Sequence, residues 1–153
     1  MYKTNFNAAV FRSTNSAGVG VVVRNWRGEL VGVLSAPIPL AHSVANMEAL
    51  ARQRAVEFAT ELRLQRVIFE GDSTIVINAI IQGTSGFSTY GNVVEDIRCQ
   101  ATLFQSCMFN HVNRFCNCVA DALARKAKSE QGSRVWLVNQ PEDISSLLFF
   151  DVH

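Results

Sequence analysis

Residues 17–35 read AGVGVVVRNWRGELVGVLS, the clearest structural signal in the chain. Two valine-rich runs, residues 17–24 and 29–36, are separated by the short polar segment NWRG at residues 25–28. β-Branched residues favour strands, and a short turn that contains glycine joins two strands into a hairpin. The stretch therefore predicts two neighbouring antiparallel strands.

The segments on either side extend this hairpin into an α/β sheet. Residues 4–11 form a further strand candidate, close enough to complete an antiparallel meander of three strands. After residue 42 helices and strands alternate: a helix capped by Ser43 and ending near residue 62, a strand at 66–70, helices at 73–82 and 90–103, a strand at 107–112 and a helix at 117–128. This order predicts a five-stranded mixed sheet with helices on both faces.

Composition indicates a globular protein of one domain. The chain has 153 residues, of which 48% are hydrophobic, enough for a substantial core. The formal net charge is only +1, so any contact with nucleic acid must come from a local patch. No apolar run approaches the length of a membrane span, and the residues after Met1 do not resemble a signal peptide. We therefore expect no membrane partner.

Cysteine content indicates free thiols. The chain has four cysteines, Cys99, Cys107, Cys116 and Cys118. The last two form C-x-C, which lacks the C-x-x-C spacing of a zinc knuckle or a redox motif. We therefore expect free cysteines in a reducing compartment, and a cytoplasmic or nuclear location.

Three acidic residues lie where such a sheet brings its elements together. Glu48 falls on an apolar seam of the long helix, and Asp72 follows the strand at 66–70, where ligand sites collect. Asp121 lies in the first turn of the last helix. Each residue also has an ordinary structural explanation. Glu48 could be solvated at the edge of the seam, Asp72 could cap a helix, and Asp121 could interact favourably with the helix dipole. Together they suggest a divalent-metal site that works on phosphate. The seam consists of Val44, Ala51, Ala55, Phe58 and Leu62.

Five segments carry a resemblance to a known family. They are KTNFNAAVF (3–11), AGVGVVVRNWRGELVGVLS (17–35), NMEALARQRAVEFA (46–59), RVIFEGDS (66–73) and HVNRFCNCVADALA (111–124). Their order and spacing resemble the ribonuclease H type 1-like domains. More narrowly, the chain resembles the plant group that is related to the reverse transcriptases of retroelements. The resemblance covers nearly the whole chain, from about residue 3 to residue 128, and implies a ribonuclease H-like fold.

The resemblance implies an endonuclease that uses two metal ions to hydrolyse the RNA strand of an RNA–DNA hybrid. Its cofactor would be Mg²⁺, with Mn²⁺ as an alternative. The residues that match the functional positions of the family are Glu48, Asp72 and Asp121 for the metal, His111 for turnover, and Asn117 and Ser73 for the substrate.

Asn7 departs from the family pattern, which has a catalytic aspartate on the first strand that bridges both metals. An amide is nearly the same size as a carboxylate, so the fold should be kept. It brings no negative charge and only one good ligand oxygen, whereas two cations about 3.5–4 Å apart need carboxylates to offset their charge. We therefore expect weak magnesium binding and little or no cleavage.

Two functions remain open on this evidence. The first is the hybrid ribonuclease, and the second is a non-catalytic module that binds nucleic acid or protein, a pseudoenzyme remnant of a retroelement. A set of basic residues could form a surface that follows the phosphates of a nucleic acid, although the same residues fit an ordinary solvated basic face equally well. Its members are Arg24, Arg27, Arg52, Arg54, Arg63, Arg66, Arg125 and Lys126.

The chain divides into a ribonuclease H-like domain at residues 1–131 and a C-terminal extension at 132–153. The extension is apolar enough to dock on the domain or on a protein partner. A larger retroelement polyprotein is one such partner.

Overall fold

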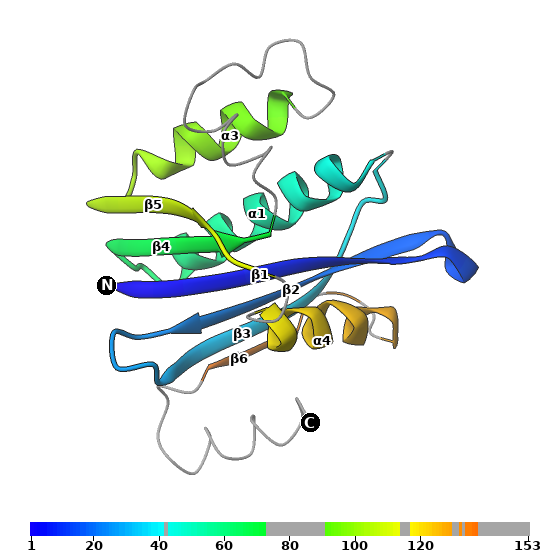
Figure 1. Cartoon of the computed structure of the whole chain (residues 1–153), viewed down its shortest axis with the longest axis horizontal. Coiled ribbons are helices and arrows are strands. Elements are labelled where there is room, and N and C mark those ends of the chain that lie inside the picture. The colour runs from blue at the N-terminus through cyan, green and yellow to red at the C-terminus, as the bar shows by residue number, and fades with distance from the viewer. Residues whose placement is uncertain (42, 73–90, 114–116, 130–131, 133, 138–153) are drawn as a thin grey trace.

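The computed structural model describes residues 1–41, 43–72, 91–113, 117–129, 132 and 134–137 (Figure 1). The helix expected at 73–82 lies outside these residues, and so does most of the C-terminal extension. The helical elements are α1 (Val44–Glu61), α3 (Gly91–Ala101) and α4 (Cys118–Lys126), with short 3₁₀ turns η1 (Arg12–Thr14) and η3 (Ala127–Ser129). The strands are β1 (Tyr2–Phe11), β2 (Ser16–Arg24), β3 (Leu30–Ile38), β4 (Arg66–Gly71), β5 (Ser106–His111) and β6 (Arg134–Leu137).

These strands form one mixed sheet in the order β5-β4-β1-β2-β3-β6. The pairs β1–β2 and β2–β3 are antiparallel, which confirms the predicted meander, and β4 runs parallel to both β1 and β5. The expected α/β architecture is therefore confirmed.

The strand count of five was wrong, because β6 adds a sixth strand at the free edge of β3. This strand has only four residues, in which Val135 is exposed and Trp136 is buried. Such a short run gives almost no periodic signal, so the sequence alone left it in the extension. The pairing protects an edge that would otherwise present open backbone groups.

The two faces of the sheet carry different cores, as the alternation of side chains along β2 shows. Val19, Val21 and Val23 belong to the larger core, on the side of α1. Val22 points the other way and joins Leu123 of α4 in a smaller cluster. Helices α1 and α4 therefore cover opposite faces, as expected (Figure 1).

Helix α1 begins where predicted, because the hydroxyl oxygen of Ser43 accepts a hydrogen bond of 3.1 Å from the Asn46 N–H. Two expectations about its faces were wrong. Val44, the first helical residue, is 86% exposed and takes no part in the seam. Arg52 is fully buried, so it cannot belong to a phosphate-tracking surface.

Helix α4 packs unusually close to the sheet because β2 has glycine where the two meet. A Cβ added to Gly20 would lie 2.0 Å from the Ala120 carbonyl oxygen, and one on Gly18 would lie 2.6 Å from the Ala124 carbonyl oxygen. Real Cβ atoms never approach backbone this closely, so both glycines are required by packing. The Ser35 hydroxyl then fixes the helix by donating a 2.7 Å hydrogen bond to the Leu123 carbonyl oxygen.

Two smaller expectations concern the thiols and the membrane. Cys99 and Cys107 are free thiols, Cys118 is exposed at the start of α4, and Cys116 lies outside the described residues. Within the described part of the chain, no helix has both the length and the hydropathy needed to cross a membrane.

Candidate functional site

The candidate site lies where one edge of β1 loses its neighbour. Strand β4 pairs with β1 only from Tyr2 to Asn5, and no other described strand covers the edge beyond that point. The alternation of β1 turns Phe6 toward the α1 side, whereas Asn7 contacts α4. Both helices therefore reach the open edge, from opposite faces of the sheet.

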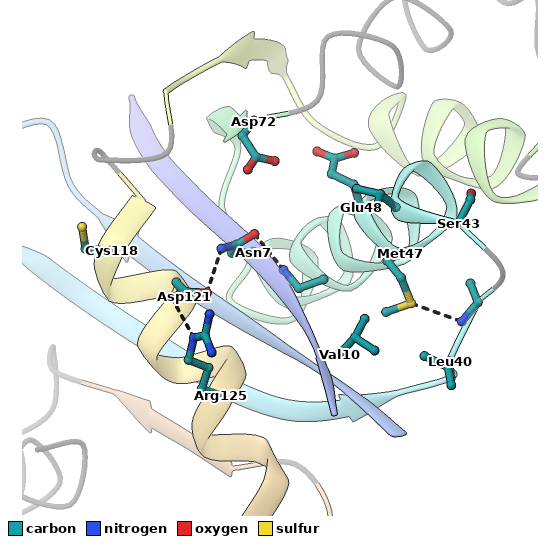
Figure 2. Close-up of a pocket in the computed structure, with 13 residues that line it drawn as sticks. Asn7, Val10, Leu40, Ser43, Met47, Glu48, Asp72, Cys118, Asp121 and Arg125 are labelled. Atoms are coloured by element: carbon teal, nitrogen blue, oxygen red, sulfur yellow. Dashed lines mark hydrogen bonds and ion pairs between the residues drawn. The ribbon is translucent and has the colours of Figure 1, made fainter. Parts of the chain in front are cut away.

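A cavity of about 570 Å³ occupies this open edge, and Figure 2 shows it. Four residues singled out from the sequence line it together, from four different elements: Asn7 on β1, Glu48 on α1, Asp72 directly after β4, and Asp121 on α4. In Figure 2, Asn7 lies between Glu48 and Asp72 on one side and Asp121 on the other.

The remaining three site residues are placed differently. His111 ends β5 in register with Gly71, but it is exposed and does not line the cavity. Asn117 is only 1% exposed, and its amide donates a 2.7 Å hydrogen bond to the Phe6 carbonyl oxygen. This amide joins the start of α4 to β1, and its contact with substrate stays a prediction. Ser73 lies outside the described residues.

Asn7 is held by hydrogen bonds at both ends of its amide. The Ala8 N–H donates to its Oδ1 at 3.0 Å, and its Nδ2 donates to Asp121 Oδ1 at 3.2 Å. The other oxygen of Asp121 accepts a 3.0 Å bond from Arg125 Nε, one helical turn further along α4. Both oxygens of this carboxylate therefore already have partners within the protein (Figure 2).

Glu48 is also paired with an arginine, and this ion pair is far more deeply buried than that of Asp121 with Arg125. Its Oε1 accepts a hydrogen bond of 2.5 Å from Arg52 Nη2, and the Glu48 and Arg52 side chains are only 7% and 0% exposed. Burial raises the pKa of Glu48 above its usual value; the charge and hydrogen bond of Arg52 act against this, and the Asp72 carboxylate adds to it. Neither Arg52 nor Arg125 was recognised as a carboxylate partner from the sequence, although each stands four residues after its acid, a spacing typical of helical ion pairs.

The other wall of the cavity is apolar. It includes Val10 of β1, Leu40 before α1, and Val44 and Met47 of α1. Three of these side chains, Val10, Leu40 and Val44, are exposed to solvent. No periodic pattern marks them, because they come from three separate segments. The cavity therefore offers an apolar surface beside the acidic residues.

The residues present do not fit a pair of metal ions. Glu48 is bound to the buried Arg52, Asp121 accepts hydrogen bonds from Asn7 and from the exposed Arg125, and the fourth expected position carries a neutral amide. The described residues contain no group of three or more His, Cys, Asp or Glu side chains that could hold a metal ion. A two-metal site needs several uncompensated carboxylates close together, and this arrangement does not provide them.

Residues 5–127 match the family model described as reverse transcriptase-like. The chain belongs to that family. Ribonuclease H1 from the halophilic archaeon Halobacterium salinarum NRC-1 is similar in structure, with a TM-score of 0.70 and 25% sequence identity over 85% of this chain and 98% of that one. The family match and this neighbour identify a ribonuclease H1-like domain.

Two further solved structures share the fold of this ribonuclease H1-like domain. One is LC11-RNase H1 in complex with RNA/DNA hybrid, with a TM-score of 0.70 and 22% identity over 83% of this chain and 96% of that one. The other is the foamy viral protease-reverse transcriptase in complex with RNA/DNA hybrid, with a TM-score of 0.64 and 19% identity over 84% of this chain but only 20% of that one. No curated protein matches the chain.

Proposed function

We propose that this ribonuclease H1-like domain binds RNA–DNA hybrid at the cavity on the open edge of β1, and that it has lost most or all of its hydrolytic activity. The observation that carries this proposal is the hydrogen bond from Asn7 Nδ2 to Asp121 Oδ1. The family resemblance implies a carboxylate at position 7 of the cavity. The chain has instead the neutral amide of Asn7, which donates a hydrogen bond to the neighbouring Asp121 carboxylate.

Chemistry explains why this contact separates binding from cleavage. Hydrolysis of a phosphodiester depends on charge stabilisation at the transition state, which this family draws from carboxylate-bound cations. Binding of a hybrid depends on the shape of the duplex and on backbone and 2′-hydroxyl contacts. An amide at position 7 removes one negative charge from the cavity, which lowers repulsion of phosphate while it weakens cation binding.

The comparisons and the cavity support this choice of ligand. Two structures of the same fold hold RNA/DNA hybrid, and a further foamy viral structure holds dsDNA. The exposed Arg125 and the apolar wall at Val10 and Leu40 supply one cation and an apolar contact surface at the cavity rim. Both kinds of contact are suited to a sugar–phosphate backbone.

Fluorescence anisotropy with a labelled hybrid in EDTA tests this function. We expect salt-sensitive binding that is stronger for the hybrid than for duplex DNA of the same sequence. A cleavage assay on the same hybrid in Mg²⁺ should show little or no product. Equal affinity for both duplexes, or an affinity independent of salt, contradicts the binding proposal.

The second candidate is hydrolysis of the RNA strand, with Mg²⁺ or Mn²⁺ as cofactor. It is favoured by one observation, that Glu48, Asp72 and Asp121 all line the same cavity. Single-turnover cleavage by the natural chain and by Asn7→Asp distinguishes the two candidates. Efficient cleavage by the natural chain would establish the enzyme and reject the binding module.

The biological setting is also a proposal. The resemblance to retroelement reverse transcriptases of plants suggests a domain that derives from such a protein. The foamy viral structure carries this fold in 20% of its chain, which supports a larger polyprotein as the context of this domain. The alternative is a separate protein partner that the apolar extension at 132–153 contacts. Co-purification with and without residues 138–153 tests the role of the extension.

A further inference from the structure

Arg52 is the largest fully buried side chain that the structure describes, and it lies directly behind Glu48. Its guanidinium carbon is 4.6 Å from the centroid of the Phe6 ring and 5.7 Å from that of Phe109. Its Nε and Nη1 have no hydrogen-bond partner among the described residues, and its Nη2 donates to Glu48 Oε1, with which it also forms an ion pair. Since arginine stays protonated in proteins, this buried positive charge is permanent.

Both oxygens of Glu48 are withdrawn from the cavity solvent. Oε1 is bound to Arg52, and Oε2 is buried without a hydrogen-bond partner among the described residues. The pair is also enclosed by the backbone of β4: a Cβ added to Gly71 would lie 2.6 Å from Glu48 Oε1 and 2.7 Å from Arg52 Nη2. A hydrated divalent cation would therefore have to displace the guanidinium or open this packing to reach the carboxylate.

We propose that Arg52 is a built-in counter-ion that keeps Glu48 out of metal coordination. The buried positive charge of Arg52 neutralises the Glu48 carboxylate in place of a metal cation. Glu48 therefore forms part of the cavity wall but contributes no uncompensated negative charge to the cavity. Arg52 is thus a positioning residue, acting through Glu48. The inference deepens the proposed function and rests on it, because it assumes that the same cavity receives the nucleic acid.

The neighbouring pair of Arg125 and Asp121 provides a contrast within the same cavity. Both pairs have the same spacing of four residues, but the Arg125 side chain is 70% exposed and that of Asp121 37%. An exposed ion pair is weak and exchanges readily with solvent ions, whereas a buried one holds its partner because separation would leave an uncompensated charge. A cation can therefore displace the exposed Arg125 from Asp121, whereas it cannot readily displace the buried Arg52 from Glu48.

A consequence is that Asn7→Asp alone does not rebuild the ligand set of the family. The new carboxylate would join Asp72 and Asp121, while Glu48 stays bound to Arg52. The titration is therefore done in the Asn7→Asp background, with Mn²⁺ alone and no nucleic acid, by isothermal calorimetry. We expect Glu48→Gln to change the Mn²⁺ affinity less than threefold, while Asp72→Asn and Asp121→Asn each lower it at least tenfold. A tenfold loss in Glu48→Gln would overturn the inference.

A second variant guards against misfolding of Glu48→Gln. Replacing both partners, Glu48→Met with Arg52→Met, removes a buried ion pair without leaving either charge alone, a change that folds tolerate well. Its Mn²⁺ affinity in the Asn7→Asp background should equal that of Asn7→Asp itself. A tenfold lower affinity in this folded double variant would show that Glu48 is a ligand after all.

Release of Glu48 gives the complementary test. Arg52→Met in the Asn7→Asp background should raise Mn²⁺ affinity at least tenfold, and the matched Arg125→Met should change it less than threefold. Unchanged affinity in a folded Arg52→Met variant contradicts the role of Arg52. Hybrid binding in EDTA is measured on the same preparations, so that failure of the proposed function is seen separately from failure of the metal titration.

Discussion

Asn7 Nδ2 lies 3.2 Å from Asp121 Oδ1 and joins the open edge of β1 to the first turn of α4. The orientation of the amide is defined by its other end, which accepts the Ala8 N–H. A carboxylate at position 7 could accept the same N–H, but it could not donate to Asp121. The contact therefore distinguishes asparagine from aspartate in a way that size does not.

Asn7→Asp should destabilise the protein in the absence of divalent cations. It replaces a hydrogen bond by two carboxylates in close proximity, so we expect the free energy of unfolding to fall by about 1–3 kcal/mol. Urea denaturation in EDTA measures the change. Asn7→Ala is the control, because it removes the hydrogen bond without adding charge and should cost about 1 kcal/mol. An Asn7→Asp variant as stable as the natural chain would contradict this interpretation of the contact.

Gly20→Ala should displace α4 and with it Asp121. The added Cβ meets the Ala120 carbonyl oxygen at 2.0 Å and Leu123 Cβ at 2.7 Å, so backbone has to move. We expect a loss of about 1–3 kcal/mol in unfolding free energy, or more, as for other overpacked cores. The matched control is Gly32→Ala, whose nearest neighbour is the flexible end of the Leu137 side chain at 3.1 Å. Equal stability of the two variants would refute the role of Gly20.

Asn117→Leu should weaken the attachment of α4 to β1. The substitution keeps the number and branching of the side-chain heavy atoms but leaves the buried Phe6 carbonyl oxygen without its donor. Loss of a partner for a buried acceptor costs about 1–3 kcal/mol. Thermal unfolding followed by circular dichroism measures the loss. A stability within experimental error of the natural chain would show that this hydrogen bond does not stabilise the attachment of α4 to β1.

Cys107 should react slowly with alkylating reagents. Burial raises the pKa of its thiol from 9.0 to about 11, so the thiolate is disfavoured in the folded protein. Its contribution to stability is fully present below about pH 9 and is lost as the pH rises through about 11. Iodoacetamide labelling at pH 8.5 can be followed by mass spectrometry. The labelling rate of Cys107 should be lower than that of the exposed Cys99 by a factor of about ten or more. In urea the two thiols should react at equal rates. Equal rates in the folded chain would contradict the predicted protection of Cys107.

Arg125→Ala should weaken hybrid binding and reduce its dependence on salt. Arg125 is an exposed cation at the cavity rim, and loss of one phosphate contact lowers the slope of log affinity against log salt by about 1. Arg27→Ala is the control, because Arg27 lies in the turn between β2 and β3 and does not line the cavity. If both variants bind alike, the hybrid does not use this rim.

The meander of β1, β2 and β3 and the start of α1 were predictable because their signals are local. Valine content, the NWRG turn and the Ser43 cap act over a few residues, and each is confirmed in the structure. Strand β6 was not predictable, because four residues gain their conformation from pairing with β3 rather than from their own pattern.

The sequence by itself determined the class of fold and the identities of Asn7, Glu48, Asp72 and Asp121 as residues of interest, since local pattern and family resemblance both reside in the order of residues. Only the tertiary structure decided that they line one cavity and which of them are already paired. Arg52 shows why: a basic residue four positions after an acid can be a solvated neighbour or a buried counter-ion, and the sequence is the same in both cases. The distinction depends on the desolvation that Phe6, Phe109 and the backbone at Gly71 impose, and these come from three strands that meet Arg52 only when the sheet and α1 have packed together.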